Sequence, residues 1–262
     1  MIEGTYYKEW SPTLGRDMEF KVFGHSGCPV LALPGRGGRF YDWEDQGLVA
    51  ACAPLLHAGK MQLFCADGLD GEGLLDADLP LRRRAEMQEE YFCYLTRELA
   101  PRILELNAAG GKTPKTSLWC AGVDIGAYQA VNCRLRRPAL FTGAVGLSGL
   151  YDLHRFAQGQ EIARDDLWLR NSPTEYLHKD GLTDKTLLAQ AKPDQLTLCA
   201  GQGPYEQDAL TDTQALAQLL QAQGLPVHLE VWGYDVAHDW YWWGRQWNLF
   251  AERLFGQQGK EE

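Results

Sequence analysis

Short apolar runs alternate with longer helical patterns along almost the whole chain, and this alternation limits the fold more than any other feature of the sequence. The runs that we interpret as strands are 20–23, 29–33, 61–66, 117–121, 144–147, 196–200 and 227–232. The helical patterns cover 46–57, 81–106, 127–136, 208–223 and 240–254. Strands that are apolar on both faces are typical of a parallel sheet covered on both sides by helices. We therefore predict an α/β fold with a mostly parallel central sheet and helices on both faces.

No internal repeat, low-complexity tract or linker divides the 262 residues. A chain of this length can form one large domain with a sizeable core, so we predict a single domain over residues 1–262. The stretch 151–194 follows a predicted strand but has weak periodicity. We expect it to be a small helical cap, inserted over the carboxyl edge of the sheet.

The chain is acidic, with 35 acidic and 25 basic residues and a formal net charge of −10. Its mean field repels phosphate backbones and anionic lipids, so we expect neither nucleic acid nor a membrane as a partner. The densest cationic run, 82–84, lies beside three glutamates on a predicted helix. No apolar stretch is long enough to cross a bilayer, which takes about 18 residues.

Seven cysteines are widely spaced, and none of them forms a C-x-x-C pair. Most lie in apolar runs, which indicates buried, reduced thiols. The first residues lack the features of a signal peptide, so we expect a cytoplasmic protein. The sequence has no H-E-x-x-H motif and no Cys/His cluster, so we expect neither a metal nor another cofactor. The sequence leaves open whether the chain forms a homo-oligomer.

The first turn of chemical interest is Gly122-Val123-Asp124-Ile125-Gly126, between a predicted strand and a predicted helix. It fits the pattern G-x-S-x-G, in which two glycines allow a sharp turn that raises the central side chain above the sheet. Asp124 stands where that pattern has serine. The alternative is a glycine-rich turn in which Asp124 only caps the following helix.

A second turn, 34–40, contains three glycines and directly follows the predicted strand 29–33. Exposed N–H groups in such a loop can form an oxyanion hole. The loop fits neither the P-loop pattern nor the dinucleotide fingerprint. The alternative is a plain flexible turn.

Two further turns offer an acid and a base. Glu206, or Asp208 as a weaker candidate, follows the predicted strand 196–200, and His238 lies between the last predicted strand and the last helix, beside several tryptophans. Glu206 can also be an ordinary solvated side chain, and His238 a structural one. The order of the four turns is oxyanion loop, elbow, acid and histidine, which is the chain order of the α/β-hydrolase triad.

At this point the chain resembles the putative-esterase (esterase D-like) family of α/β-hydrolases over nearly its whole length. The segments that carry the resemblance are 37–41, 62–67, 126–128, 147–152, 171–173, 201–203 with Glu206, 231–233 and 238–240, of which His238-Asp239-Trp240 is the most distinctive. Members of that family mostly hydrolyse carboxylic esters or thioesters, and some transfer acyl groups. The resemblance therefore implies a small ester or acyl compound as the substrate.

The resemblance also implies a role for individual residues. His238 would be the base, Glu206 its orienting acid, and Asp124 would occupy the position of the nucleophile. The backbone of Arg36, Gly37, Gly38 and Arg39, with the N–H group of Ile125, would form the oxyanion hole. Trp240 and Tyr151 are expected to contact the substrate.

Aspartate at the nucleophile position changes the chemistry. Serine attacks when histidine removes its proton, but a carboxylate has no proton to give, and its attack on an ester would form a more reactive anhydride. A carboxylate can instead attack saturated carbon, although Ile125 replaces the tryptophan that dehalogenases carry after the aspartate. Tyr151 and Tyr176 lie in the region where epoxide hydrolases carry paired tyrosines. Ser148, at a strand end, is a weak alternative nucleophile, and Cys120 inside a strand is a poor one.

Three functions follow as hypotheses. The first is an esterase with weak or altered chemistry. The second is a non-catalytic protein that keeps the hydrolase pocket for binding, with Asp124 and His238 as a buried ion pair that raises the pKa of the histidine. The third is a hydrolase that uses Asp124 as a nucleophile at saturated carbon.

Overall fold

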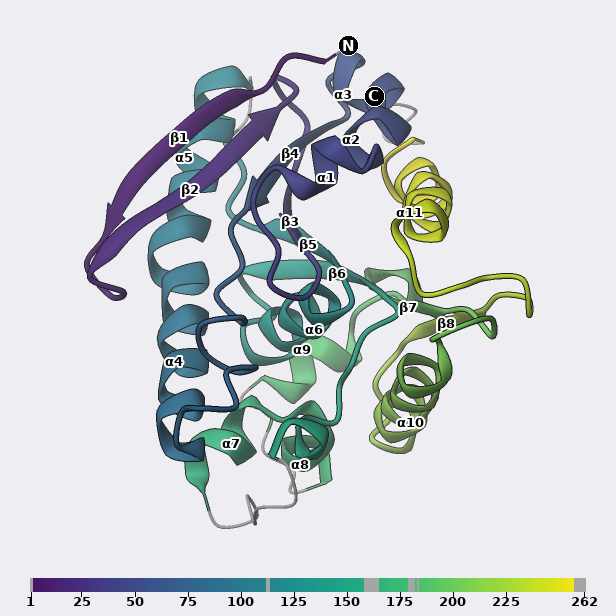
Figure 1. The fold of residues 1–262 in the computed structure, drawn as a ribbon. Coiled ribbons are helices and arrows are strands. Elements are labelled where there is room, and N and C mark those ends of the chain that lie inside the picture. Colours follow the sequence, from purple (N-terminus) through teal and green to yellow (C-terminus); the bar gives the residue numbers. More distant parts are fainter. Residues whose placement is uncertain (1, 112–113, 158–164, 179–181, 183, 257–262) are drawn as a thin grey trace.

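The computed structural model describes residues 2–111, 114–157, 165–178, 182 and 184–256, and its central element is one eight-stranded sheet (Figure 1). The strands are β1 (Thr5–Ser11), β2 (Arg16–Phe23), β3 (Cys28–Leu33), β4 (Met61–Ala66), β5 (Leu118–Val123), β6 (Phe141–Leu147), β7 (Leu196–Ala200) and β8 (His228–Val231). Their order across the sheet is β1-β2-β4-β3-β5-β6-β7-β8. All pairs from β4 to β8 are parallel, whereas β2 pairs antiparallel with both β1 and β4. The predicted fold class is confirmed.

Strand β1 is absent from the prediction made from the sequence. It lies at the edge of the sheet, and most of its side chains are exposed or half-buried. An edge strand of this kind has no continuous apolar run, so the pattern that reveals buried parallel strands does not reveal it.

Helices cover both faces of the sheet. They are α1 (Asp42–Asp45), α2 (Leu48–Ala51), α3 (Ala53–His57), α4 (Leu81–Tyr94), α5 (Ala100–Gly110), α6 (Ile125–Arg136), α7 (Asp166–Asn171), α8 (Pro173–His178), α9 (Lys185–Ala189), α10 (Gln207–Ala222) and α11 (Trp240–Phe255). A π-helical turn, η1 (Leu95–Leu99), joins α4 to α5, and two 3₁₀ turns are η2 (Leu153–Ala157) and η3 (Pro193–Gln195).

Two apolar cores lie on opposite sides of the sheet. One core joins the strands to α1, α2, α3 and α11, and includes the fully buried Trp43 and Trp247, whose rings meet edge to face. The other joins the strands to α4, α5, α6 and α10, and includes Tyr128 and Phe141. Figure 1 shows α4 and α5 on the side of the sheet away from α11.

Two predicted helices differ in detail from the structure. The expected helix 46–57 is two short helices, α2 and α3, because Gly47 adopts a left-handed φ of 84° and Pro54 starts a new turn in α3. The expected helix 81–106 continues to Gly110 but contains the π turn η1. Pro101 has no N–H group to bond the carbonyl of Arg97 one turn earlier, and a π turn accommodates that missing bond.

The segment 151–194 forms only short helices where it is described. Helices α7 and α8 contact α4 and α10, and Tyr128 of α6 donates a hydrogen bond to the carbonyl of Asn171 at 2.9 Å. These helices therefore pack on the outer side of the helical layer, whereas Phe156 of η2 packs against the small cluster that contains Ile125, the residue after Asp124. Residues 158–164, 179–181 and 183 of the expected cap lie outside the described residues.

All seven cysteines are free thiols, five of them buried. Within the described ranges, no helix combines the length and the apolar character needed to span a membrane.

Candidate active site at the carboxyl edge of the sheet

Asp124 lies at a sharp turn between β5 and α6, with a positive φ of 51° and a ψ of −119°. Both neighbouring glycines are required for this turn. A Cβ atom on Gly122 would lie 2.0 Å from the carbonyl oxygen of Gly126, and one on Gly126 would lie 2.2 Å from the carbonyl oxygen of Pro34. Backbone strain of this kind at a strand end is typical of functional positions. Asp124 therefore lies at the point that the elbow pattern predicts.

The carboxylate of Asp124 is 5% exposed and contacts the loop after β3. Its Oδ2 atom accepts a hydrogen bond from the backbone N–H of Arg36 at 3.1 Å, and its Oδ1 atom lies 3.7 Å from Nη2 of the Arg36 guanidinium. The N–H group that faces the elbow is therefore occupied by the side chain of the elbow residue itself.

His238 lies between two carboxylates. Its Nε2 atom is 3.6 Å from Oδ1 of Asp124, and its Nδ1 atom is 3.5 Å from Oε2 of Glu206. These distances exceed those of ordinary hydrogen bonds, so the contacts are ion pairs. Burial by itself lowers the pKa of His238, but Asp124 and Glu206 outweigh it and raise the pKa to about 9. The imidazole is therefore an imidazolium at neutral pH.

Glu206 is fully buried, and two side chains hold it in place. The hydroxyl of Ser148 donates to Oε1 of Glu206 at 2.6 Å, and Nε1 of Trp243 donates to that hydroxyl at 3.0 Å. Ser148 directly follows β6 and has a positive φ of 50°. The ring of Trp243 also meets the ring of His238 edge to face, with centroids 4.9 Å apart. The hydroxyl of Ser148 is thus bonded to the acid.

The loop after β3 supplies fewer donors to the elbow than the sequence suggests. The N–H of Gly37 donates to Asp70, that of Gly38 to the carbonyl of Gly35, and that of Arg39 to Asp42. Arg39 also binds Asp67 and Glu19 through its guanidinium. Of the four loop residues expected at the oxyanion hole, only Arg36 directs its N–H toward Asp124, because the other three N–H groups stabilise the loop. Ile125 is the first residue of α6 and is 1% exposed.

The two expected substrate contacts differ from each other. Trp240 lies near Asp124: a Cβ atom on Gly35 would meet Trp240 at 3.7 Å and the Cβ of Asp124 at 3.8 Å. Trp240 also lines an open cavity of about 650 Å³ with Trp232 and Trp242. Tyr151, in contrast, is fully buried in the apolar core. The expectation that Tyr151 contacts a substrate is therefore corrected, because its side chain has no exposed surface.

Apolar side chains form one wall beside the elbow. Ile125, Leu150 and Ala209 form a small buried cluster, against which Leu75 and Phe156 pack. Within the described residues, no group of three His, Cys, Asp or Glu side chains is arranged to hold a metal ion.

A model of the family described as "Putative esterase" matches residues 11–256. The chain belongs to this family. The resemblance found in the sequence is thereby confirmed. No sequence match was found among curated proteins.

Solved structures of the same fold extend over the whole chain. A ferulic acid esterase is 18% identical, covers 94% of this chain and 95% of its own, and gives a TM-score of 0.69. An S-formylglutathione hydrolase from Agrobacterium tumefaciens is 16% identical, covers 97% of both chains, and gives 0.68. MPT51 (FbpC1) from Mycobacterium tuberculosis is 15% identical, covers 98% of this chain and 99% of its own, and gives 0.72. At these identities the similarity shows the fold.

One carboxylate of this esterase-family site was missed in the sequence. Asp70 follows β4, is 5% exposed, and accepts the N–H of Gly37 at 2.8 Å. Burial, with a smaller contribution from the charge of Asp124, raises the pKa of Asp70 to about 6. Its position after a predicted parallel strand could have indicated it, since the loops after such strands meet at one edge of the sheet.

Proposed function

We propose that this member of the esterase family binds a small ester or acyl compound at the Asp124 site and hydrolyses esters only weakly. The observation that carries the proposal is the hydrogen bond from the Arg36 N–H to Oδ2 of Asp124. An oxyanion donor stabilises acyl transfer only when it can reach the oxygen of the substrate. Here the carboxylate of the elbow residue holds that donor.

Two further features also favour weak ester hydrolysis. Asp124 has no hydroxyl proton to lose, so it cannot form an acyl-enzyme in the way that serine does. His238, with a pKa raised to about 9, already carries its proton at neutral pH and cannot accept another. The acid, the histidine and the elbow residue of an esterase site lie close together. The ion pair between Asp124 and His238, however, keeps the histidine protonated, so that it does not act as a base.

The direct test is the hydrolysis of p-nitrophenyl acetate by the wild type and by Asp124→Ser. Serine would free the Arg36 N–H, remove one anion from His238 and restore a nucleophile, so we expect the rate to rise by about 10²–10⁴-fold. Ser148 shows that serine tolerates the required backbone, since its φ is 50° against 51° for Asp124. Asp124→Ala and Asp124→Asn are the controls and should stay at the wild-type level. Rapid wild-type hydrolysis that survives Asp124→Ala would refute the proposal.

The position of the Asp124 carboxylate also favours a second function, the hydrolysis of a compound with an electrophilic saturated carbon. Oδ2 is held by a backbone donor while Oδ1 faces His238, which is a suitable arrangement for Oδ1 to attack saturated carbon. With an epoxide, a new bond forms from Oδ1 to carbon, the carbon–oxygen bond of the ring breaks, and imidazolium His238 protonates the departing oxygen. The alkyl ester leaves Asp124 neutral, so the pKa of His238 falls and it can activate the water that cleaves the ester.

Isotope labelling separates this second function from binding alone. A single turnover of styrene oxide in ¹⁸O-water should place the label in the Asp124 peptide, because water attacks the carbonyl carbon of the ester. Asn replaces the nucleophile isosterically in Asp124→Asn and should show no label. A wild-type protein that stays unlabelled and converts no epoxide would exclude this function and leave the binding proposal in place.

A further inference from the structure

A second cavity, of about 340 Å³, lies at the end of α6 opposite to Asp124 and is lined by Arg97, Arg136, Arg137, Arg170 and Glu89. Helix α6 has 12 residues, so its two ends are about 18 Å apart. In a chain with a net charge of −10, four arginines facing one glutamate are a local reversal of the overall charge.

One of these arginines is fixed in the wall of the cavity. Arg136 donates from Nη1 to Oδ1 of Asn171 at 2.7 Å and from Nη2 to Oε1 of Glu89 at 2.9 Å. Its guanidinium also lies over the ring of Phe92, 3.6 Å from the centroid. Glu89 is therefore already bonded to Arg136, and its single negative charge cannot balance four arginines.

The remaining three arginines keep donors for a ligand. Arg97 and Arg137 are exposed, and their side chains form no hydrogen bond or ion pair with the part of the chain that the structure describes. Among the described residues, the ion pair of Arg170 is a long contact of 4.0 Å with Oε1 of Glu89. Like charges that gather around one cavity repel one another, so an anion bound among them would be stabilised by all three.

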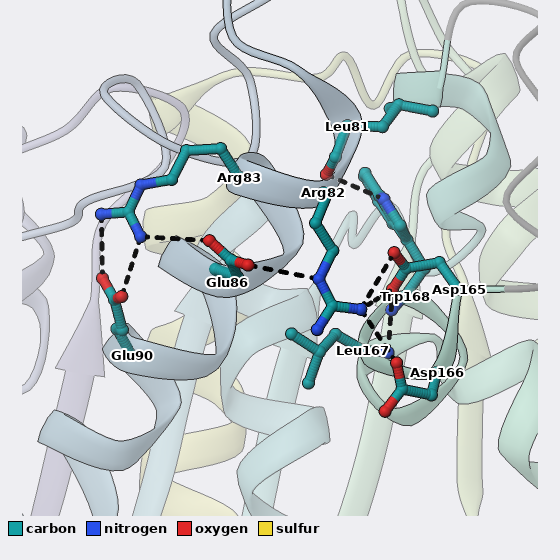
Figure 2. Close-up of polar contacts among 9 residues, drawn as sticks. All are labelled: Leu81, Arg82, Arg83, Glu86, Glu90, Asp165, Asp166, Leu167 and Trp168. Atoms are coloured by element: carbon teal, nitrogen blue, oxygen red, sulfur yellow. Dashed lines mark hydrogen bonds and ion pairs between the residues drawn. The ribbon is translucent and has the colours of Figure 1, made fainter.

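The neighbouring arginines of α4 differ in this respect. Figure 2 shows Arg82 bonded to Glu86, Asp165 and Asp166, and Arg83 bonded to Glu86 and Glu90. Their charges are matched by acidic side chains of the same surface. Arg97 and Arg137 have no such acidic partners among the described residues.

The backbone also has a special conformation at Arg97. This residue lies within the π turn η1, which Pro101 accompanies one turn later. Single π turns inside α-helices occur frequently at functional sites, because the extra residue changes the direction of the side chains that follow.

We propose that this cavity binds a small organic anion with at least two negative charges, such as a phosphate monoester or a di- or tricarboxylate. The planar guanidinium binds both phosphate and carboxylate in a bidentate manner. The volume lies at the lower end of the range of ligand pockets, about 300–1,000 Å³. Phe92 and Tyr176 supply an apolar surface for the carbon part of the ligand. The site is separate from Asp124 and does not depend on the function proposed there.

Calorimetric titration of the wild-type protein with phenyl phosphate, which is a phosphate monoester, and with citrate tests the proposal. We expect binding that weakens as the salt concentration rises, because it rests on charge. Arg97→Gln and Arg137→Gln should each weaken it by about tenfold or more, the loss expected for one charge-assisted hydrogen bond. Removing a cation from a like-charged cluster should leave the melting temperature of the unliganded protein unchanged or slightly higher.

Arg83→Gln is the matched control, since Arg83 lies on α4, which runs directly into the π turn of Arg97, but is paired with Glu86 and Glu90. It should keep the wild-type affinity. Three results would overturn the proposal: no heat from either anion up to about 10 mM, well above the range of specific sites; unchanged affinity in both Arg97→Gln and Arg137→Gln; or an equal loss in Arg83→Gln, which would indicate non-specific attraction.

Discussion

At the scale of single residues, the geometry gives Ser148 and Trp243 a positioning role. Ser148 accepts a hydrogen bond from Trp243 and donates one to Glu206, which in turn faces His238. None of the hydrogen bonds that the structure describes for these two residues goes to Asp124. The sequence offers Ser148 only as a weak alternative nucleophile, because the resemblance implies a structural Ser-Gly pair there, and it leaves the role of the tryptophans open. A chain of contacts through three loops is not visible in any local pattern.

The effect of Ser148→Ala on kcat should therefore be measured in a variant that is catalytically active. In the Asp124→Ser background, loss of the hydroxyl leaves a buried oxygen of Glu206 unsatisfied, so we expect kcat to fall by about tenfold with KM unchanged. Ser172→Ala is the control, because Ser172 is equally buried but bonds the carbonyl of Trp168, away from the site. Equal losses of kcat in both variants would show that Ser148 has only a structural role.

At the scale of elements, the elbow depends on the close approach of α6 to the end of β3. The backbone at Gly126 leaves no room for a Cβ atom, which would lie 2.2 Å from one carbonyl oxygen and 2.5 Å from another. These neighbours are backbone atoms that cannot rotate away. The G-x-x-x-G spacing around Asp124 is therefore a requirement of packing as well as of the turn.

Gly126→Ala should lower the free energy of unfolding by about 1–3 kcal/mol, the usual cost of overpacking. Gly244→Ala is the matched control, since a Cβ atom there would meet only Leu48, at an ordinary 3.7 Å, within the helix α11. That change should stabilise the protein by about 0.5–1 kcal/mol, because alanine favours helix more than glycine does. Chemical denaturation measures both. A neutral Gly126→Ala would contradict the tight contact.

At the scale of the whole molecule, the buried parallel strands and the order of the turns could be predicted from the sequence. Strands such as β4 and β7 are fully buried, so their apolar runs are continuous and easily recognised. Three features could not be predicted from apolar periodicity: the edge strand β1, the helix break at Gly47 and the π turn before Pro101. They depend on exposure at the sheet edge and on the backbone properties of single glycine and proline residues. The burial of Tyr151 and the hydrogen bond from the Gly37 N–H to Asp70 depend on tertiary packing. No single segment of the sequence predicts them.

The stability of the whole molecule should depend on the charge of His238. Its folded-state pKa, about 9, lies above the ordinary value of 6.5. The stabilisation is therefore fully present below about pH 6.5, and is lost as the pH rises through about 9, by at most about 3 kcal/mol. Urea denaturation at several pH values should show this loss in the wild type, and a much smaller one in Asp124→Asn. Stability that is independent of pH over this window in both proteins would contradict the ion pair.

The most direct measurement of the central claim is the titration of His238 by NMR in the wild type and in Asp124→Asn. If the carboxylate of Asp124 holds an imidazolium between itself and Glu206, the wild-type ring should titrate near pH 9. In Asp124→Asn one anion is gone while burial remains, so its pKa should fall toward the ordinary value of 6.5. A wild-type His238 that titrates near 6.5, or one whose pKa does not respond to Asp124→Asn, would contradict the account.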